Sequence, residues 1–293
     1  MKINTGQGTI PLITLIGIWS VSALTSLPGL AVSPILGELS TIFPHATELD
    51  IQMLTSLPSL LIIPFVLLAG KLAEKRDFIR LLRVGLWLFA ASGVLYLFSS
   101  RMWQLMAVSA LLGIGAGLII PLSTGLISRY FTGEYRVRQF GYSSAITNMT
   151  LVVATAVTGY LAEVHWRLPF AVYLLPLISL VLSAYLKKAA SVTIKQAADI
   201  IPPIQSTPVI SGKYGIHIRH LVQLMLFYGL VTYVVLAVTF NLPFLMEAHH
   251  FSSGNSGLMI SLFFLAIMVP GFMLDSLVKL LGNKTKLYSR DVF

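Results

Sequence analysis

Long apolar stretches separated by short polar connections dominate the chain. A helix needs about 20 consecutive, mainly apolar residues to cross a bilayer, and eight stretches come close to that length or exceed it. They are residues 10–36, 51–73, 81–99, 102–128, 141–164, 168–186, 220–246 and 256–281. The first follows Met1 and Lys2, but its apolar run is longer than that of a signal peptide, so we expect a retained helix. The pattern predicts an all-α fold, a polytopic membrane helix bundle.

The composition supports this class of protein. Of the 293 residues, 56% are hydrophobic and 11% are charged, whereas a soluble globular protein has roughly 25% charged residues. There is no cysteine, which excludes disulfides, thiolate catalysis and cysteine-based metal sites. A formal net charge of +9 is also typical of nucleic-acid-binding proteins, so the positions of the basic residues must decide between the two classes.

Basic residues collect in every second connection. Eighteen of the 20 Lys and Arg residues lie in connections that would share one side of the membrane, and only Arg101 and Arg167 lie on the other side. The positive-inside rule therefore predicts a multi-pass protein of the cytoplasmic (plasma) membrane with its N-terminus in the cytoplasm. The distribution argues against nucleic acid as a partner, because the basic residues mark topology and lie close to the lipid bilayer.

One connection is much longer than the others. Residues 187–217 are mildly basic and are interrupted by Pro202 and Pro203, which is typical of a linker. We therefore expect an N-terminal six-helix transmembrane bundle over residues 1–186 and a cytoplasmic linker over 187–217. A partial C-terminal bundle of two transmembrane helices would follow over 218–293.

Two short motifs recur on both sides of this linker. They are Gly70-x-x-x-Glu74 with Gly271-x-x-x-Asp275, and Pro34-x-x-x-Glu38 with Pro243-x-x-x-Glu247. The last two stretches thus resemble the first two, as in an internal repeat. In the first motif, glycine would let a neighbouring backbone approach closely, and the acid would hold basic side chains or the N-terminus of the next helix. The alternative is an ordinary membrane-exit loop, where charges collect in any case.

Further motifs follow along the chain in a fixed order. They are Gly70-Lys-Leu-Ala-Glu74-Lys75, Gly113-Ile-Gly115-Ala-Gly117, Arg136-Val-Arg138-Gln-Phe-Gly141 and Trp166-Arg167-x-x-Phe170. In this order they resemble the major facilitator superfamily of secondary transporters, from the charged loop between helices two and three to the start of helix six. The chain departs from the family's loop signature where Asp77 replaces a usual glycine, and where Phe78 and Ile79 replace a usual basic pair.

The resemblance implies two six-helix halves that give alternating access to a central site. It therefore implies secondary active transport of a small-molecule solute, by efflux or uptake, with no nucleotide cofactor and with a proton or a sodium ion as the candidate coupling ion. It also implies a conformational charge cluster, whose residues here are Gly70, Glu74, Asp77, Arg80, Arg136, Arg138 and Asp275. Ser109, where many drug–proton antiporters have an arginine, and the absence of a Gly-Pro motif in helix five argue against an antiporter.

Members of this family have twelve helices, whereas this chain has eight apolar stretches. A second hypothesis therefore stays open, in which the chain is a non-transporting truncated fragment or a membrane interaction protein. We expect the first six helices to form a compact bundle and stretches seven and eight to pack less securely. We also expect that a chain ending at Phe293 does not transport by itself.

Polar residues within the apolar stretches are the candidates for a solute site. No ionisable residue lies near the middle of a stretch, and we interpret the acids near the outer ends as interfacial charges. The uncharged candidates for a substrate cavity are Asn148, Gln223, Tyr228, Tyr233 and Asn241. A polar group in hydrocarbon must bond to a neighbouring helix or line a wet cavity, and both interpretations stay open. Hydrolase, metalloprotease, phosphate-loop and dinucleotide motifs are absent, so the sequence predicts no enzyme, metal site or nucleotide site.

Overall fold

The computed structural model describes residues 2–6, 8–186 and 218–272. The predictions for the linker at 187–217 and for Asp275 lie outside the described residues. The helices are α1 (Leu12–Ala23), α2 (Leu27–Leu30), η1 (Ser33–Ile35), α3 (Leu36–Ile42), α4 (Glu48–Lys75), α5 (Phe78–Phe98), α6 (Met102–Tyr130), α7 (Gly133–Val164), η2 (Leu168–Leu174), α9 (Ile218–Ala248) and α10 (Ser253–Phe272), with a further helical segment at 176–186. Strands β1 (Lys2–Asn4) and β2 (Thr9–Pro11) form a short antiparallel hairpin before α1.

The prediction of an all-α membrane bundle is confirmed. Seven helical segments of the described chain are long and apolar enough to cross a membrane, and each matches one of the predicted stretches. They are Leu12–Ile42, Glu48–Lys75, Phe78–Phe98, Met102–Tyr130, Gly133–Val164, Leu168–Leu186 and Leu221–Ala248. The last predicted stretch overlaps α10, which contains a shorter apolar helix at Ser253–Ala266.

Prolines divide the first span into short pieces. Residues Leu12–Ile42 form α1, α2, η1 and α3 in succession rather than one continuous helix. Pro28 lies in α2 and Pro34 lies in η1. Proline lacks a backbone N–H group and clashes with the preceding turn, so it breaks a long helix. The apolar pattern locates this span correctly but does not show these breaks.

Helix α7 begins well before its apolar stretch does. The hydrophobic pattern places the start at residue 141, whereas α7 starts at Gly133. Gly133 has a φ of +54°, a conformation that glycine adopts without strain. Arg136 and Arg138, expected on a loop, therefore lie in the first turns of α7. That expectation is wrong, because an apolar pattern reports where a helix enters the membrane and not where the helix begins.

The glycines of α6 let α4 and α5 approach closely. A Cβ atom added at Gly113 would lie 2.6 Å from the carbonyl oxygen of Pro58 on α4. A Cβ atom at Gly115 would lie 2.8 Å from the backbone nitrogen of Phe89 on α5, and one at Gly117 would again meet α4. Only glycine permits such contacts between helix backbones. Gly113 and Gly117 therefore act as packing residues, as their spacing of four in the sequence indicates.

Side-chain hydrogen bonds join α1 to α7. Trp19 Nε1 donates to Gln139 Oε1 over 3.0 Å. Thr147 Oγ1 donates to the carbonyl oxygen of Ser22 over 2.9 Å, and Ser26 Oγ donates to the carbonyl oxygen of Thr147 over 3.2 Å. Polar groups within membrane spans need such partners, because lipid offers none. We conclude that α1 and α7 form one wall of the bundle.

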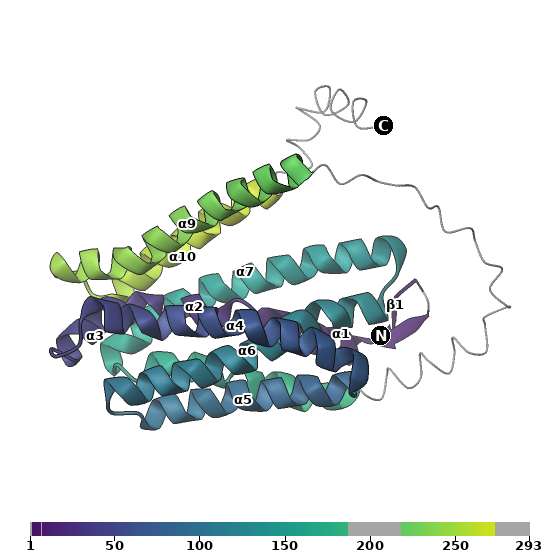
Figure 1. Cartoon of the computed structure of the whole chain (residues 1–293), viewed down its shortest axis with the longest axis horizontal. Helices are drawn as coiled ribbons and strands as arrows, with labels where there is room; N and C mark the ends of the chain where they lie inside the picture. The colour runs from purple at the N-terminus through teal and green to yellow at the C-terminus, as the bar shows by residue number, and fades with distance from the viewer. Residues whose placement is uncertain (1, 7, 187–217, 273–293) are drawn as a thin grey trace.

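The α9–α10 pair touches the rest of the protein mainly at one end (Figure 1). We call the end that carries the β1–β2 hairpin and the α4–α5 turn the hairpin end, and the opposite end, with α3 and the α9–α10 turn, the α3 end. The pair packs on the bundle at the α3 end and diverges from α7 toward the hairpin end (Figure 1). The burial of the α9 side chains is consistent with this arrangement. Thr239 and Met246, near the α3 end, are buried, whereas Tyr228, nearer the hairpin end, is 72% exposed.

Candidate functional site

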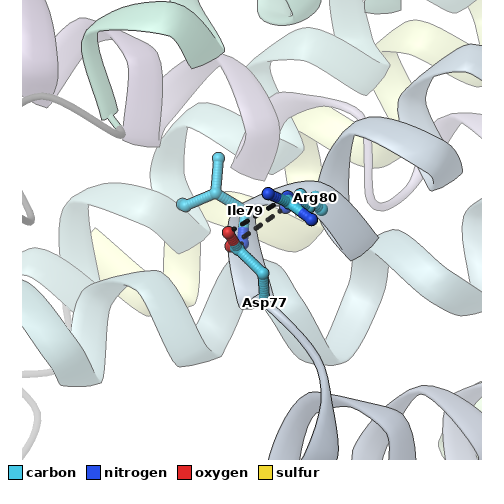
Figure 2. Close-up of polar contacts among 3 residues, drawn as sticks. All are labelled: Asp77, Ile79 and Arg80. Carbon is cyan, nitrogen blue, oxygen red and sulfur yellow. Dashed lines mark hydrogen bonds and ion pairs between the residues drawn. The ribbon is translucent and has the colours of Figure 1, made fainter.

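At the α4–α5 turn, Asp77 caps the N-terminus of α5. Its Oδ1 accepts hydrogen bonds from the backbone N–H groups of Ile79 at 3.0 Å and Arg80 at 3.3 Å (Figure 2). Arg80 Nε also lies 3.5 Å from Asp77 Oδ2, with both side chains exposed. A helix cap contributes about 1 kcal/mol to stability, whereas an exposed ion pair contributes about 0–1 kcal/mol. In this structure Asp77 therefore acts mainly as a helix cap.

Gly70 and Glu74 lie on the last turns of α4, and both are exposed. A Cβ atom added at Gly70 would meet no atom of the described chain within 4 Å. The close backbone approach expected at this glycine is therefore not seen among these residues. Glu74 forms no ion pair within the described part of the chain.

Arg136 and Arg138 do not join the α4–α5 turn. Arg136 Nε donates to the carbonyl oxygen of Phe131 over 2.9 Å and so ties the start of α7 to the end of α6. The Arg138 side chain is exposed. Neither forms an ion pair with an acid of the α4–α5 turn in residues 2–6, 8–186 and 218–272. Of the residues expected in the charge cluster, Asp77 and Arg80 form an ion pair in the described part of the chain.

Asn148 lies at the middle of α7, where its Nδ2 donates to the carbonyl oxygen of Ser144 over 2.9 Å. Each helical residue turns the side chain by about 100°, so Asn148 lies on the same face as Val152, Thr155 and Gly159. That face packs against α10 nearer to the α3 end. Asn148 therefore continues the α10-facing surface of α7 toward the hairpin end, which is a suitable position for a residue of a central site.

The four candidates on α9 do not share one face. Gln223 and Asn241 lie about five helical turns apart and so point to the same side. Tyr228 lies about five turns before Met246, on the side that is buried against the bundle near the α3 end. Tyr233 lies about 140° around the helix from Tyr228. Tyr228 therefore lies on the side of α9 that faces the six-helix bundle, whereas Gln223, Asn241 and Tyr233 lie on other sides of the helix.

Helices α7 and α10 cross at two glycines near the α3 end. A Cβ atom at Gly159 would lie 2.6 Å from the carbonyl oxygen of Ser253 and 2.8 Å from Gly257 Cα. A Cβ atom at Gly257 would lie 2.6 Å from the carbonyl oxygen of Thr155 and 2.9 Å from Gly159 Cα. The backbones of the two helices thus touch directly, and this contact requires glycine at both positions.

The two copies of the proline–acid motif meet at the same end. A Cβ atom at Gly37, next to Glu38, would collide with the carbonyl oxygen of Pro243 and lie 2.9 Å from Glu247 Cβ. The charges of Glu247 and Glu163 both act on Glu38. Three acids, from α3, α7 and α9, therefore gather at the α3 end, where the apolar pattern alone suggests separate interfacial charges.

An apolar cluster extends this closed region toward the middle of the bundle. Leu151 and Val152 of α7 pack with Ile260 and Phe264 of α10, and Leu30 packs against them. Backbone contact and apolar packing together close the crossing of α7 and α10. Closer to the hairpin end, the surfaces of α7 and α9 are exposed.

A separate apolar pocket of about 610 Å³ lies between α7 and η2. Val153 and Val157 of α7 line one side, and Val172 and Leu175 line the other. On α7, Val153 and Val157 lie roughly opposite Asn148. This pocket is therefore distinct from the surface between the α9–α10 pair and the bundle, and none of the predicted cavity residues lines it.

The apolar pattern misses two contacts between distant segments. The apolar pattern leaves Gln139 on a loop, and its partner Trp19 is 120 positions away. Glu163 Oε1 accepts a hydrogen bond from the backbone N–H of Gly254 over 3.1 Å, yet Glu163 has the pattern of an interfacial charge. The small residues of α10 opposite Gly159 are the signal that could have revealed this contact. Within the described ranges, no group of three or more His, Asp or Glu residues could hold a metal ion.

Comparison with known proteins identifies the family. The family model of the Major Facilitator Superfamily matches residues 14–291. The chain is 32% identical over 115 residues to Quinolone resistance protein NorA of Staphylococcus aureus, an alignment that covers 39% of this chain and 29% of NorA. It is 31% identical over 103 residues to Multidrug resistance protein 1 of Bacillus subtilis (strain 168), which covers 35% of this chain and 26% of that protein. The matched region thus spans less than a third of each relative's length.

Solved structures with a similar fold include a D-xylose-proton symporter, with a TM-score of 0.58 and 15% identity, over 90% of this chain and 68% of that chain. A bacterial homolog of the human lysosomal transporter Spinster, in an inward-facing and occupied conformation, has a TM-score of 0.58 and 14% identity, over 88% of this chain and 60% of that chain. At such identities the likeness shows the fold alone. Because the family model covers nearly the whole chain, this protein belongs to the Major Facilitator Superfamily, a family of secondary transporters and not of enzymes.

Proposed function

We propose that the chain carries out secondary active transport of a small organic solute by alternating access between the α9–α10 pair and the six-helix bundle. The one-sided contact between these two groups is the main support. At the α3 end the backbones of α7 and α10 touch at Gly159 and Gly257, whereas Tyr228 of α9 is exposed nearer the hairpin end. Transporters of this kind close one side of a central site while the other side is open.

The solute would bind where the closed contact gives way to the exposed surfaces. Asn148 offers an amide donor and acceptor there, and Tyr228 offers an aromatic ring with a hydroxyl group. Thr232 lies one turn from Tyr228 on the same side of α9, and its hydroxyl group donates a hydrogen bond to the carbonyl oxygen of Tyr228. A mainly apolar surface with a few polar groups suits an amphipathic organic molecule. The names of the relatives, a quinolone resistance protein and a multidrug resistance protein, favour efflux of such a molecule in exchange for a proton or a sodium ion. In this proposal they outweigh the departures at Ser109 and in helix five, which by themselves argue against an antiporter.

In this proposal the hairpin end lies in the cytoplasm of a plasma-membrane protein. The distribution of basic residues supports that orientation, and the state described here would then be open to the cytoplasm. A reporter fused within residues 187–217 should be cytoplasmic, and a reporter fused within 248–255 should be on the opposite side. Finding both reporters on the same side would refute this topology.

Solute flux in liposomes tests the function itself. The purified chain would be reconstituted, a proton or sodium gradient imposed, and the movement of a fluorescent quinolone followed. Flux would support this proposal and would overturn the expectation from the sequence that the chain does not transport by itself. Asn148→Ala should lower the rate about fivefold, since one lost hydrogen bond to the solute is worth about 1 kcal/mol. Asn241→Ala is the matched control, because it removes the same amide group from a side of α9 that points away from the six-helix bundle. Absence of flux from a correctly folded chain would favour the alternative, a membrane interaction protein or fragment that does not transport.

A further inference from the structure

The N-terminus of α10 is held by a side chain from another helix. The backbone N–H of Gly254, the second residue of α10, donates to Glu163 Oε1 over 3.1 Å. The first N–H groups of a helix have no acceptor within the helix and need one from elsewhere. Glu163 lies in the last turn of α7, so this acceptor comes from the six-helix bundle.

The first turn of α10 is seated on α7 by further contacts. Ser253 Oγ donates to the carbonyl oxygen of Gly159 over 3.2 Å, at a buried position. A Cβ atom added at Gly254 would collide with Glu163 Oε1. Glycine at this position therefore allows the carboxylate to approach the helix end.

Helix α10 does not depend on Glu163 in order to form. Ser252 Oγ, just before α10, accepts a hydrogen bond from the backbone N–H of Asn255 at 3.4 Å, as a local N-cap does. The contact with Glu163 is additional and links two helical groups. It can be lost without unwinding α10, and it exists only while α10 lies against α7.

Charge strengthens the dependence on this contact. Glu163 shares the α3 end with Glu38 and Glu247, and the negative charges of Glu163 and Glu247 both act on Glu38. The N-terminus of a helix carries a partial positive charge, which offsets such repulsion within the first turn. Glu163 is therefore best accommodated when α10 is in place.

From these contacts we infer that Glu163 is a gating residue, which stabilises the closed α3 end by capping α10 and releases α10 when that end opens. The inference rests on the proposed alternating-access function for its role in transport. Its test measures conformation and needs no solute, so the two can fail separately.

The absence of cysteine allows spin labels to be placed at will. Trp103→Cys at the start of α6 and Phe251→Cys in the α9–α10 turn are exposed sites on the two sides of the α3 end. Distances between the labels would be measured by pulsed electron resonance for the whole chain in lipid nanodiscs. Glu163→Ala should shift the ratio of closed to open populations about fivefold toward open, as expected for loss of one helix cap.

Two further variants and one control make the test specific. Glu163→Gln keeps an oxygen acceptor at the same place and should restore most of the closed population, whereas Gly254→Ala should displace the carboxylate and mimic Glu163→Ala. Glu134→Ala removes the acid at the other end of α7 and should leave the distances unchanged. Distances in Glu163→Ala that match the wild type, or a Glu163→Gln variant as open as Glu163→Ala, would overturn the inference. Shifted distances without solute flux would support the gating role of Glu163 while refuting the transport proposal.

Discussion

The glycine crossing between α7 and α10 provides the strongest test of how the α3 end closes. In Gly159→Ala, the added methyl group would lie 2.6 Å from the carbonyl oxygen of Ser253 and 2.8 Å from Gly257 Cα. Both atoms belong to the backbone, so no side chain can rotate away to relieve the overlap. The helices must therefore separate, or the α3 end must open.

The size of the effect follows from two opposing terms. Forcing a methyl group into a closely packed contact costs about 1–3 kcal/mol. Replacing glycine by alanine within a helix gains about 0.5–1 kcal/mol, but Gly159 is helical whether the end is open or closed, so this gain cancels between the two states. The closed population should therefore fall about 5–150-fold relative to the open one.

Chemical labelling can report this change. Ser256→Cys places a thiol on α10 beside the crossing, at a position that is 3% exposed. When opening and reclosing are fast, the rate of modification by a membrane-impermeant maleimide is proportional to the open population. Gly141→Ala is the matched control on α7, because a Cβ atom there meets nothing within 4 Å. Equal labelling rates in Gly159→Ala and Gly141→Ala would refute the view that this crossing closes the α3 end.

Three further changes test contacts within the six-helix bundle through the free energy of unfolding. Asp77→Ala should lower it by about 1 kcal/mol, whereas Asp77→Asn, which can still cap α5, should lower it much less; equal losses would contradict the capping role. Arg83→Met removes the bonds from Nε to Ser183 Oγ at 2.9 Å and from a terminal guanidinium nitrogen to the Ser183 carbonyl oxygen at 3.1 Å, with an expected loss of about 1.5–3 kcal/mol in thermal or denaturant unfolding. Gln139→Leu leaves Trp19 Nε1 without its acceptor and should cost about 1–3 kcal/mol; adding Trp19→Phe should recover part of that loss, and purely additive losses would show that the two side chains are not coupled.

The positions of seven membrane spans can be read from the amino-acid pattern. Bilayer thickness imposes a minimum length on every apolar helix, so the run at residues 81–99 locates α5 (Phe78–Phe98) to within three residues at each end. The glycines of α6 were also predictable as packing residues, because small residues at a spacing of four lie on one face of a helix. The order of these motifs was enough to indicate the family.

The ends of the helices and the faces on which they pack were harder to predict from the sequence. The apolar pattern missed the first turns of α7, where Arg136 lies, because polar residues outside the membrane can still be helical. It grouped Gln223 with Tyr228, although the two lie on different sides of α9. In a soluble protein the apolar face of a helix points to the core. In a membrane span nearly every face is apolar, so the sequence does not say which one packs.

Contacts between distant segments were decided by the tertiary structure alone. Glu38, Glu163 and Glu247 are each unremarkable near the end of an apolar stretch, yet packing of α3, α7 and α9 gathers them at one end of the molecule. The hydrogen bond from Gly254 to Glu163 joins residues 91 positions apart. Lipid covers apolar side chains as well as another helix does, so burial of apolar surface does not select the partners. Close backbone contact at glycines and satisfaction of polar groups select them, and both depend on how the helices cross.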